Sequence, residues 1–176
     1  GSSSEYGDLG GELSEHMTGE GRLTNYVKGK AAASEYGFEV ADRLDRIFLH
    51  VRLFYAFGAG QHDDSLINQL YRRSVEKAAM NLSPCEHYRD YIHISDVVEG
   101  ITRICDVNES TIINLGSGHV IQLRDFVVRF WECLGSQREA LCFGAHEKPS
   151  HEPGQPRSYA NLDALRMLTG WVPAVS

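Results

Sequence analysis

The sequence predicts an α/β protein, because short apolar strands alternate with amphipathic helices along the chain. Residues 46–54 (RIFLHVRLF) are rich in Ile, Val, Phe and Leu, which is typical of a buried strand. Helical patterns lie on both sides of this strand, at 25–44 and 65–80. The polar, Gly-rich stretch that follows Tyr6 predicts a loop.

The second half of the chain continues the alternation. Ser95 is expected to cap a helix, Gly135 to end one, and Asn161 to cap the last one. The expected strands are 91–94, 111–116 and 139–144, and the expected helices are 97–105, 123–135 and 161–171.

Composition and charge exclude some classes of function. The 176 residues carry a net charge of -7 with a pI near 5.6, so a nucleic-acid partner or an anionic membrane is not expected. The apolar runs are far shorter than a membrane span. The four cysteines show no CxxC pair and predict reduced, mostly buried thiols in a cytoplasmic protein. The histidines form no strong metal-binding pattern, so no metal is expected.

Tyr26 and Lys30 form the first candidate catalytic pair. They are four residues apart on a predicted helix, so their side chains share one face. A lysine ammonium near a phenol favours the phenolate, which prepares a tyrosine to exchange a proton with a sugar hydroxyl or carbonyl. The pair alone is a weak signal, since any Tyr and Lys at this spacing match it.

The segments around this pair strengthen the signal. GSSSEYG lies upstream of the pair, and VRLFYAFGAGQ, RDYIHISDVVEGI, TIINLGSGHVIQLRDF and ANLDALRMLTGWVP follow it in order. In this order and spacing the chain resembles the C-terminal two-thirds of the extended short-chain dehydrogenase/reductases, specifically the NAD(P)-dependent nucleotide-sugar epimerases and dehydratases. The first half of that family is a Rossmann unit with a Gly-rich turn. No GxxGxxG pattern occurs in these 176 residues.

The resemblance implies a fold with two parts. Residues 1–60 would be the C-terminal part of a Rossmann-type NAD(P)-binding and catalytic domain, with a partial parallel sheet. Residues 61–176 would mostly form a smaller α/β substrate-binding lobe, with 91–115 returning to the sheet. The resemblance also implies NAD or NADP as cofactor and a nucleotide-diphosphate sugar as substrate. Relatives often dimerise through the helix Tyr26–Leu44, so a homodimer is a further expectation.

The catalytic roles are carried over from the family. Its catalytic Ser or Thr lies four residues before the Tyr of a Tyr-Gly pair, which here is Ser2. Ser2 would hydrogen-bond the reacting oxygen, Tyr26 would be the acid and base, and Lys30 would hold the nicotinamide ribose. Leu53 and Phe54 would pass close to the nicotinamide. We therefore interpret GSSSEYG as the end of a central strand plus its loop. A cloning scar would not supply Glu-Tyr-Gly at this offset, and we expect the sequence to start within a longer protein.

The substrate-binding roles are also implied by the resemblance. Arg89 would bind the diphosphate, since a guanidinium can hold phosphate oxygens in pairs; the alternative is a structural Arg–Asp pair. Leu66 would lie at the mouth of the site, where the helix begins. Ser3 and Tyr55 would face the substrate, and Arg157 would replace a missing cation.

Departures from the family pattern narrow the reaction. Dehydratases have an Asp and a Glu after the catalytic Thr, where this chain has Ser3 and Ser4. Serine cannot perform the proton transfers of water elimination. Tyr55 stands where relatives often have Asn, and Glu152 and Gln155 flank Pro-Gly where an epimerase often has Arg and Asp.

Three functions remain open on the sequence. The first is an NAD(P)-dependent nucleotide-sugar epimerase that oxidises and re-reduces a sugar carbon, expected to be C4. The second is an NADPH-dependent nucleotide-sugar 4-ketoreductase. The third belongs to another class, a non-catalytic fragment that binds nucleotide sugars.

Overall fold

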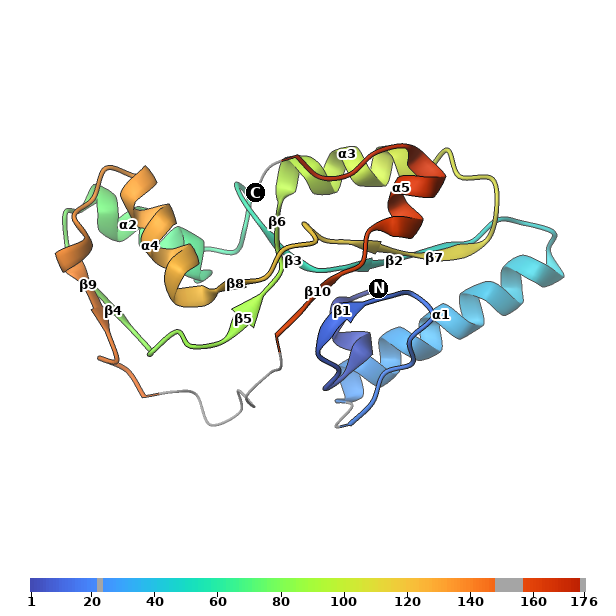
Figure 1. Cartoon of the computed structure of the whole chain (residues 1–176), viewed down its shortest axis with the longest axis horizontal. Coiled ribbons are helices and arrows are strands. Elements are labelled where there is room, and N and C mark those ends of the chain that lie inside the picture. Colours follow the sequence, from blue (N-terminus) through green and yellow to red (C-terminus); the bar gives the residue numbers. More distant parts are fainter. Residues whose placement is uncertain (22–23, 148–156, 175–176) are drawn as a thin grey trace.

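The computed structural model describes residues 1–21, 24–147 and 157–174, and its elements alternate between strand and helix (Figure 1). The helices are η1 Ser3–Tyr6, α1 Asn25–Arg43, α2 Leu66–Val75, α3 Ile94–Ile104, α4 Leu123–Cys133, η2 Arg138–Ala140 and α5 Asp163–Thr169. The strands are β1 Gly11–Leu13, β2 Leu49–Leu53, β3 Tyr55–Phe57, β4 Met80–Leu82, β5 Tyr88–Arg89, β6 Tyr91–His93, β7 Thr111–Leu115, β8 Ile121–Gln122, β9 Leu141–Phe143 and β10 Ser158–Ala160.

Parallel pairing dominates these strands. β2 pairs with β7, β3 with β6, β1 with β10 and β4 with β9, all in parallel, whereas β5 and β8 are antiparallel. The segment 46–54 enters the sheet only at Leu49 and changes partner at Phe54, whose N–H donates to Leu115 while the Tyr55 N–H donates to Asp90. The expected strand 46–54 is therefore the shorter β2, and a separate strand, β3, follows it from Tyr55.

β2 separates two environments because alternate side chains of a strand point to opposite faces. Leu49, Val51 and Leu53 pack in a cluster with residues of α3, α5 and β7. His50 and Arg52 point the other way, toward Glu5 of η1. In Figure 1, α3 and α5 lie on one side of the β2–β7 pair, while α1 and the N-terminal segment lie on the other.

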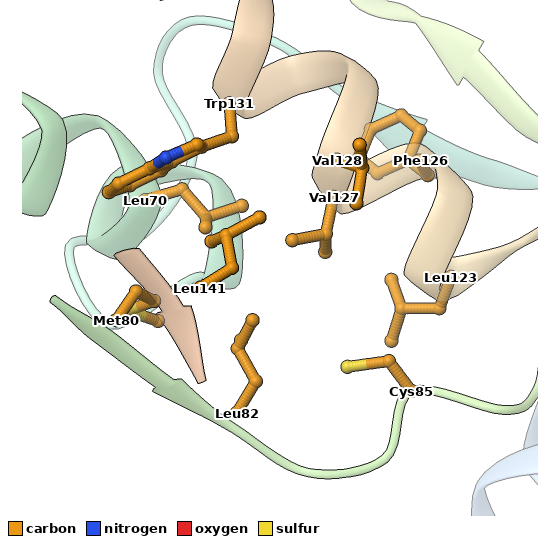
Figure 2. Close-up of a cluster of buried hydrophobic side chains, with 10 residues drawn as sticks. All are labelled: Leu70, Met80, Leu82, Cys85, Leu123, Phe126, Val127, Val128, Trp131 and Leu141. Atoms are coloured by element: carbon orange, nitrogen blue, oxygen red, sulfur yellow. The ribbon is translucent and has the colours of Figure 1, made fainter. Parts of the chain in front are cut away.

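A second cluster of buried side chains holds α2, α4, β4 and β9 together. Figure 2 shows its side chains pointing toward one another from these four elements. Trp131 is 1% exposed and its indole N–H donates to the Gln137 carbonyl at 2.9 Å. The members are Leu70, Met80, Leu82, Cys85, Leu123, Phe126, Val127, Val128, Trp131 and Leu141.

Several sequence-based expectations about the elements were wrong. The stretch after Tyr6 that was expected to be a loop contains the short strand β1, which pairs with the distant β10. The helix expected over 65–80 ends at Val75, since Lys77 has a φ of 52° and Met80 begins β4, which pairs with β9. Ser95 is not a cap. The α3 cap is His93, whose Nδ1 accepts from the Ser95 N–H at 3.3 Å.

Other local expectations had mixed outcomes. Gly135 follows Leu134, the C-cap of α4, with a φ of 74°, as a glycine that ends a helix should. The Asn161 side chain accepts from the Asp163 N–H at 2.9 Å, although the cap position itself is Leu162. All four cysteines are free, but only Cys85 is buried, so the expectation of mostly buried thiols was wrong.

Candidate active site

The segment Ser2–Tyr6 is a helical turn closed by its own side chains. The Ser2 hydroxyl accepts from the Ser4 N–H at 3.2 Å, and the Glu5 carboxylate accepts from the Ser2 N–H at 2.7 Å. This reciprocal arrangement is a capping box, for which the pattern Ser-x-x-Glu is a sequence signature. Tyr6 is buried at the end of the turn and its hydroxyl donates to Asn114 Oδ1 at 2.7 Å.

Glu5 fastens this turn to the sheet. Its carboxylate lies 3.0 Å from His50 Nε2 and accepts from Arg52 Nε at 3.2 Å, and its side chain is 2% exposed. Burial alone would raise the pKa of Glu5. The hydrogen bonds from His50 and the Ser2 N–H, together with the charges of His50 and Arg52, instead lower this pKa to about 2. The carboxylate is therefore charged at neutral pH.

The predicted pair Tyr26 and Lys30 lies on the first turns of α1. Thr24 caps this helix by accepting from the Val27 N–H at 3.3 Å. Tyr26 is 58% exposed, and Lys30 Nζ lies 5.5 Å from the centre of its ring. The helix lies against η1, and the Lys30 charge acts on Gly1, so the structure brings the pair to the same region as Ser2 (Figure 1).

A pocket beyond the carboxyl end of β2 collects several predicted site residues. Ser3, Tyr55 and Arg89, which were predicted to bind substrate, line it together with Phe54, which was predicted to pass close to the nicotinamide. The Arg89 guanidinium lies 4.7 Å from the centre of the Tyr55 ring, and its Nη1 donates to the Tyr88 carbonyl at 2.8 Å. The position suits a ligand site, since ligands bind beyond the carboxyl ends of parallel strands in open α/β sheets.

Arg157 lies beside this pocket, just before Ser158, which lines it. Its guanidinium stacks on the Tyr88 ring at 3.9 Å from the ring centre and donates to the Tyr88 hydroxyl. Two stacked arginine–tyrosine pairs, Arg89 with Tyr55 and Arg157 with Tyr88, therefore bring positive charge to this part of the chain. Glu152 and Gln155 lie outside the described residues.

Leu53 and Leu66 have their side chains in the interior and are not among the described residues that line this pocket. Leu53 packs in the cluster that α3 and α5 cover, and Leu66 packs against the cluster around Trp131. Phe54 is 5% exposed and packs with Tyr6, Leu13 and Ala160. Their contact with a cofactor or substrate remains a prediction.

Asp90 is an organising residue that the sequence analysis missed. It is 1% exposed and accepts from the Ser117 N–H at 2.6 Å, the Ser117 hydroxyl at 2.7 Å, the Gly118 N–H at 3.1 Å and the Ala160 N–H at 3.0 Å. Burial raises the pKa of this carboxyl, although these hydrogen bonds oppose the shift. Because Asp90 binds these groups, it does not form the structural pair with Arg89 that was the alternative role for this arginine. The sequence signal for Asp90 is an acidic residue next to an apolar strand.

The exposed Tyr26 and the partly exposed Lys30 fit a nicotinamide ribose. A phenol and an ammonium offer the hydrogen-bond donors that ribose hydroxyls need. Within the described parts of the chain, no three His, Cys, Asp or Glu side chains are grouped to hold a metal ion. No helix in the described ranges is long and apolar enough to cross a membrane.

Comparison with known proteins identifies the family. Residues 1–116 match the model of the NAD dependent epimerase/dehydratase family, and the chain belongs to this family. A curated relative, the CDP-abequose synthase of Salmonella typhimurium, is 26% identical over 154 residues, covering 84% of this chain and 50% of the relative. The chain thus spans about half the length of this relative.

Solved structures show the same fold. MoeE5 in complex with UDP-glucuronic acid and NAD superposes with a TM-score of 0.82 at 25% identity, over 99% of this chain and 58% of MoeE5. The UDP-glucuronic acid 4-epimerase of Bacillus cereus superposes with a TM-score of 0.81 at 20% identity, over 99% of this chain and 55% of the epimerase. These matches confirm the predicted α/β fold with its partial Rossmann-type parallel sheet.

Proposed function

We propose that this chain carries the catalytic part of an NAD(P)-dependent enzyme that transfers hydride on a nucleotide-diphosphate sugar. The observation that carries the proposal is the placement of the Tyr26–Lys30 pair on α1, which lies against the turn that begins at Ser2. When bound, NAD or NADP supplies the hydride acceptor and donor. The division into a catalytic part at 1–60 and a substrate-binding part at 61–176 is part of the proposal.

The three catalytic residues have complementary roles. Ser2 Oγ accepts from the Ser4 N–H, so its own hydroxyl proton is free to donate to the reacting sugar oxygen. Tyr26 exchanges the proton of that oxygen as general acid and base. Lys30 is near enough to stabilise the phenolate and to bind ribose hydroxyls.

The pocket beyond β2 is the proposed substrate site. Arg89 and Arg157 would bind the diphosphate, whose oxygens match a planar guanidinium. Ser3 and Tyr55 line the same pocket and would contact the sugar or its diphosphate. Leu66 opens α2 and would shape the site through packing rather than polar contact.

The reaction we propose is epimerisation at C4. Ser3 and Ser4 line the pocket at the two positions where dehydration would need an Asp and a Glu, and a serine cannot perform those proton transfers. The sugar would be oxidised to its 4-keto form and re-reduced on the other face.

A 4-ketoreductase that consumes NADPH is the second candidate. The same Ser2, Tyr26 and Lys30 would protonate the oxygen of a keto sugar, and the lack of acids at Ser3 and Ser4 suits it equally. The curated relative is a synthase of the sugar nucleotide CDP-abequose, and a reductive biosynthetic step suits that name as well as an epimerisation does. Stoichiometric consumption of NADPH would distinguish this reaction from epimerisation, which leaves the cofactor unchanged in net terms.

The test compares the wild-type protein with Tyr26→Phe. Both are incubated with UDP-, dTDP- and CDP-linked sugars and NAD or NADPH, and products are followed by NMR and by the absorbance of the reduced nicotinamide. We expect Tyr26→Phe to bind nucleotide sugar equally but to turn over about 10²–10⁴-fold more slowly. Tyr36→Phe, at a 63% exposed position on the same helix, is the matched control and should remain active. Equal binding with no turnover by either protein would instead indicate a non-catalytic binding protein.

A further inference from the structure

Glu5 is a buried charge that the proposed chemistry does not use. Its carboxylate has three partners, the Ser2 N–H at 2.7 Å, His50 Nε2 at 3.0 Å and Arg52 Nε at 3.2 Å. A buried carboxylate costs free energy unless it is paired and hydrogen-bonded. Glu5 meets this condition, but its partners belong to two different elements, η1 with its cap and β2.

The β2 side of this cluster is rigid. His50 and Arg52 alternate along a strand that pairs with β7 over five residues, so both point to the η1 face. Arg52 is held further by Nη1, which donates to the Glu15 carbonyl at 3.1 Å, and by the Tyr6 ring, 4.5 Å from its guanidinium. The sheet therefore fixes the position of the Glu5 carboxylate.

The other side of the cluster is the backbone of Ser2. The bond from the Ser2 N–H to Glu5 and the bond from the Ser4 N–H to Ser2 Oγ together define the orientation of the Ser2 side chain. Serine has one side-chain torsion, χ1, with three staggered positions, so the backbone orientation and the bond from the Ser4 N–H together decide where the hydroxyl oxygen lies.

We propose that Glu5 is a positioning residue that transmits the fixed geometry of β2, through His50 and Arg52, to the hydroxyl of Ser2. The inference rests on the proposed catalytic role of Ser2 and deepens it. Glu5 itself touches neither substrate nor cofactor. Its function is to hold the serine where its hydroxyl can meet the reacting oxygen, because small displacements of a catalytic group cost large factors in rate.

The substitution Glu5→Gln isolates this role. Glutamine keeps the size of the side chain but replaces one acceptor oxygen with an NH₂ donor. Three donors then compete for one oxygen, and the amide NH₂ faces Ser2, His50 or Arg52. The Ser2 N–H loses its charged acceptor while the size of the side chain stays the same.

The first experiment is a double-mutant cycle on turnover of the complete protein. We expect Glu5→Gln to lower kcat about 10–100-fold and to leave KM for the nucleotide sugar within about twofold. Ser2→Ala with Glu5→Gln should be no slower than Ser2→Ala alone, because residues that act as a unit are not additive. Glu39→Gln, at an exposed position on α1, is the control and should retain wild-type kcat. Losses that multiply in the double variant, or an unchanged kcat in Glu5→Gln, would overturn the proposal.

A second measurement separates this inference from the proposed function. Hydrogen exchange of the Ser2 amide, followed by NMR, reports the Ser2–Glu5 bond without any turnover. We expect exchange at Ser2 to become at least about tenfold faster in Glu5→Gln, while the amides of α1 keep their wild-type rates. If the wild type is inactive but Glu5→Gln still speeds exchange at Ser2, only the catalytic role of Ser2 is contradicted, and the positioning role of Glu5 stands. Unchanged exchange at Ser2 contradicts the role of Glu5, even in an active enzyme.

Discussion

The charge of Glu5 makes the stability of the folded chain depend on acid. The pKa of this carboxyl is about 2 in the folded chain, against an ordinary value of 4.5. A lowered folded pKa contributes stability that is fully present above pH 4.5 and is lost as the pH falls through 2. Because the side chain is only 2% exposed, solvent screens this contribution little.

We therefore expect acid to reduce the difference in unfolding free energy between wild type and Glu5→Gln. The shift corresponds to about 3 kcal/mol at neutral pH, of which about 2 kcal/mol should be lost between about pH 6 and about pH 3. Urea unfolding of both proteins at the two pH values measures this. A difference in unfolding free energy that stays the same at both pH values would show that Glu5 is not held as a charged group.

Tyr6, the residue after Glu5, forms a buried polar contact with Asn114 of β7, and this contact should stabilise the fold. The Tyr6 hydroxyl donates to Asn114 Oδ1, and the Asn114 side-chain amide donates to the Leu13 carbonyl at 2.7 Å. Tyr6→Phe should lower the free energy of unfolding by about 1–3 kcal/mol, because it leaves a buried acceptor unpaired. Tyr36→Phe removes an exposed hydroxyl and should change it by less than about 0.5 kcal/mol. Equal effects of the two substitutions would refute the contact.

At the scale of elements, Asp90 joins three segments that are distant in sequence. It follows β5, and its four hydrogen bonds reach the turn after β7 and the strand β10. Asp90→Ala leaves four donors without their acceptor, so we expect at least about 3 kcal/mol of destabilisation by chemical unfolding. Asp106→Ala, at an exposed position after α3, serves as the comparison and should have little effect. Similar losses in both variants would mean that Asp90 does not join these segments.

The helices and strands also show why only some elements could be predicted from the sequence. The apolar patterns of α1, α4 and β7 are local, so they could be predicted with small errors at their ends. β1 and β4 are short and owe their form to β10 and β9, partners 147 and 61 residues away by register. Lys77, whose positive φ separates α2 from β4, carries no sequence signal.

The candidate site divides in the same way. Tyr26 and Lys30 are neighbours on one helix, so a spacing of four residues was enough to find them. The Ser2–Glu5 capping box was not predicted, although Ser-x-x-Glu is its sequence signature. The contacts of Glu5 with His50 and Arg52 depend on the sheet. Asp90 needed the fold, because all its partners lie at least 27 residues away.

At the scale of the whole molecule, α1 presents an unusual outer surface. It runs along the outside of the β2–β7 pair (Figure 1), and its buried residues Val27, Ser34 and Ala41 share one side. Tyr36 lies on the opposite side and is 63% exposed, and Leu44, which follows the helix, is 60% exposed. Exposed large apolar side chains along a helix are typical of surfaces that bind another protein.

The family resemblance implies a homodimer through this helix, and we propose that this surface is the contact. Two copies of α1 packed against each other would cover Tyr36 and Leu44 on both chains, since a twofold axis places the same patch on each side. Light scattering of the complete protein should give twice the mass of one chain, and Tyr36→Glu should give the mass of one chain because it buries an unpaired charge at the contact. Tyr36→Phe keeps the apolar surface and should stay dimeric. A wild-type protein that is monomeric at every concentration measured would remove the dimer, while leaving the roles of Ser2, Tyr26 and Lys30 within one chain untouched.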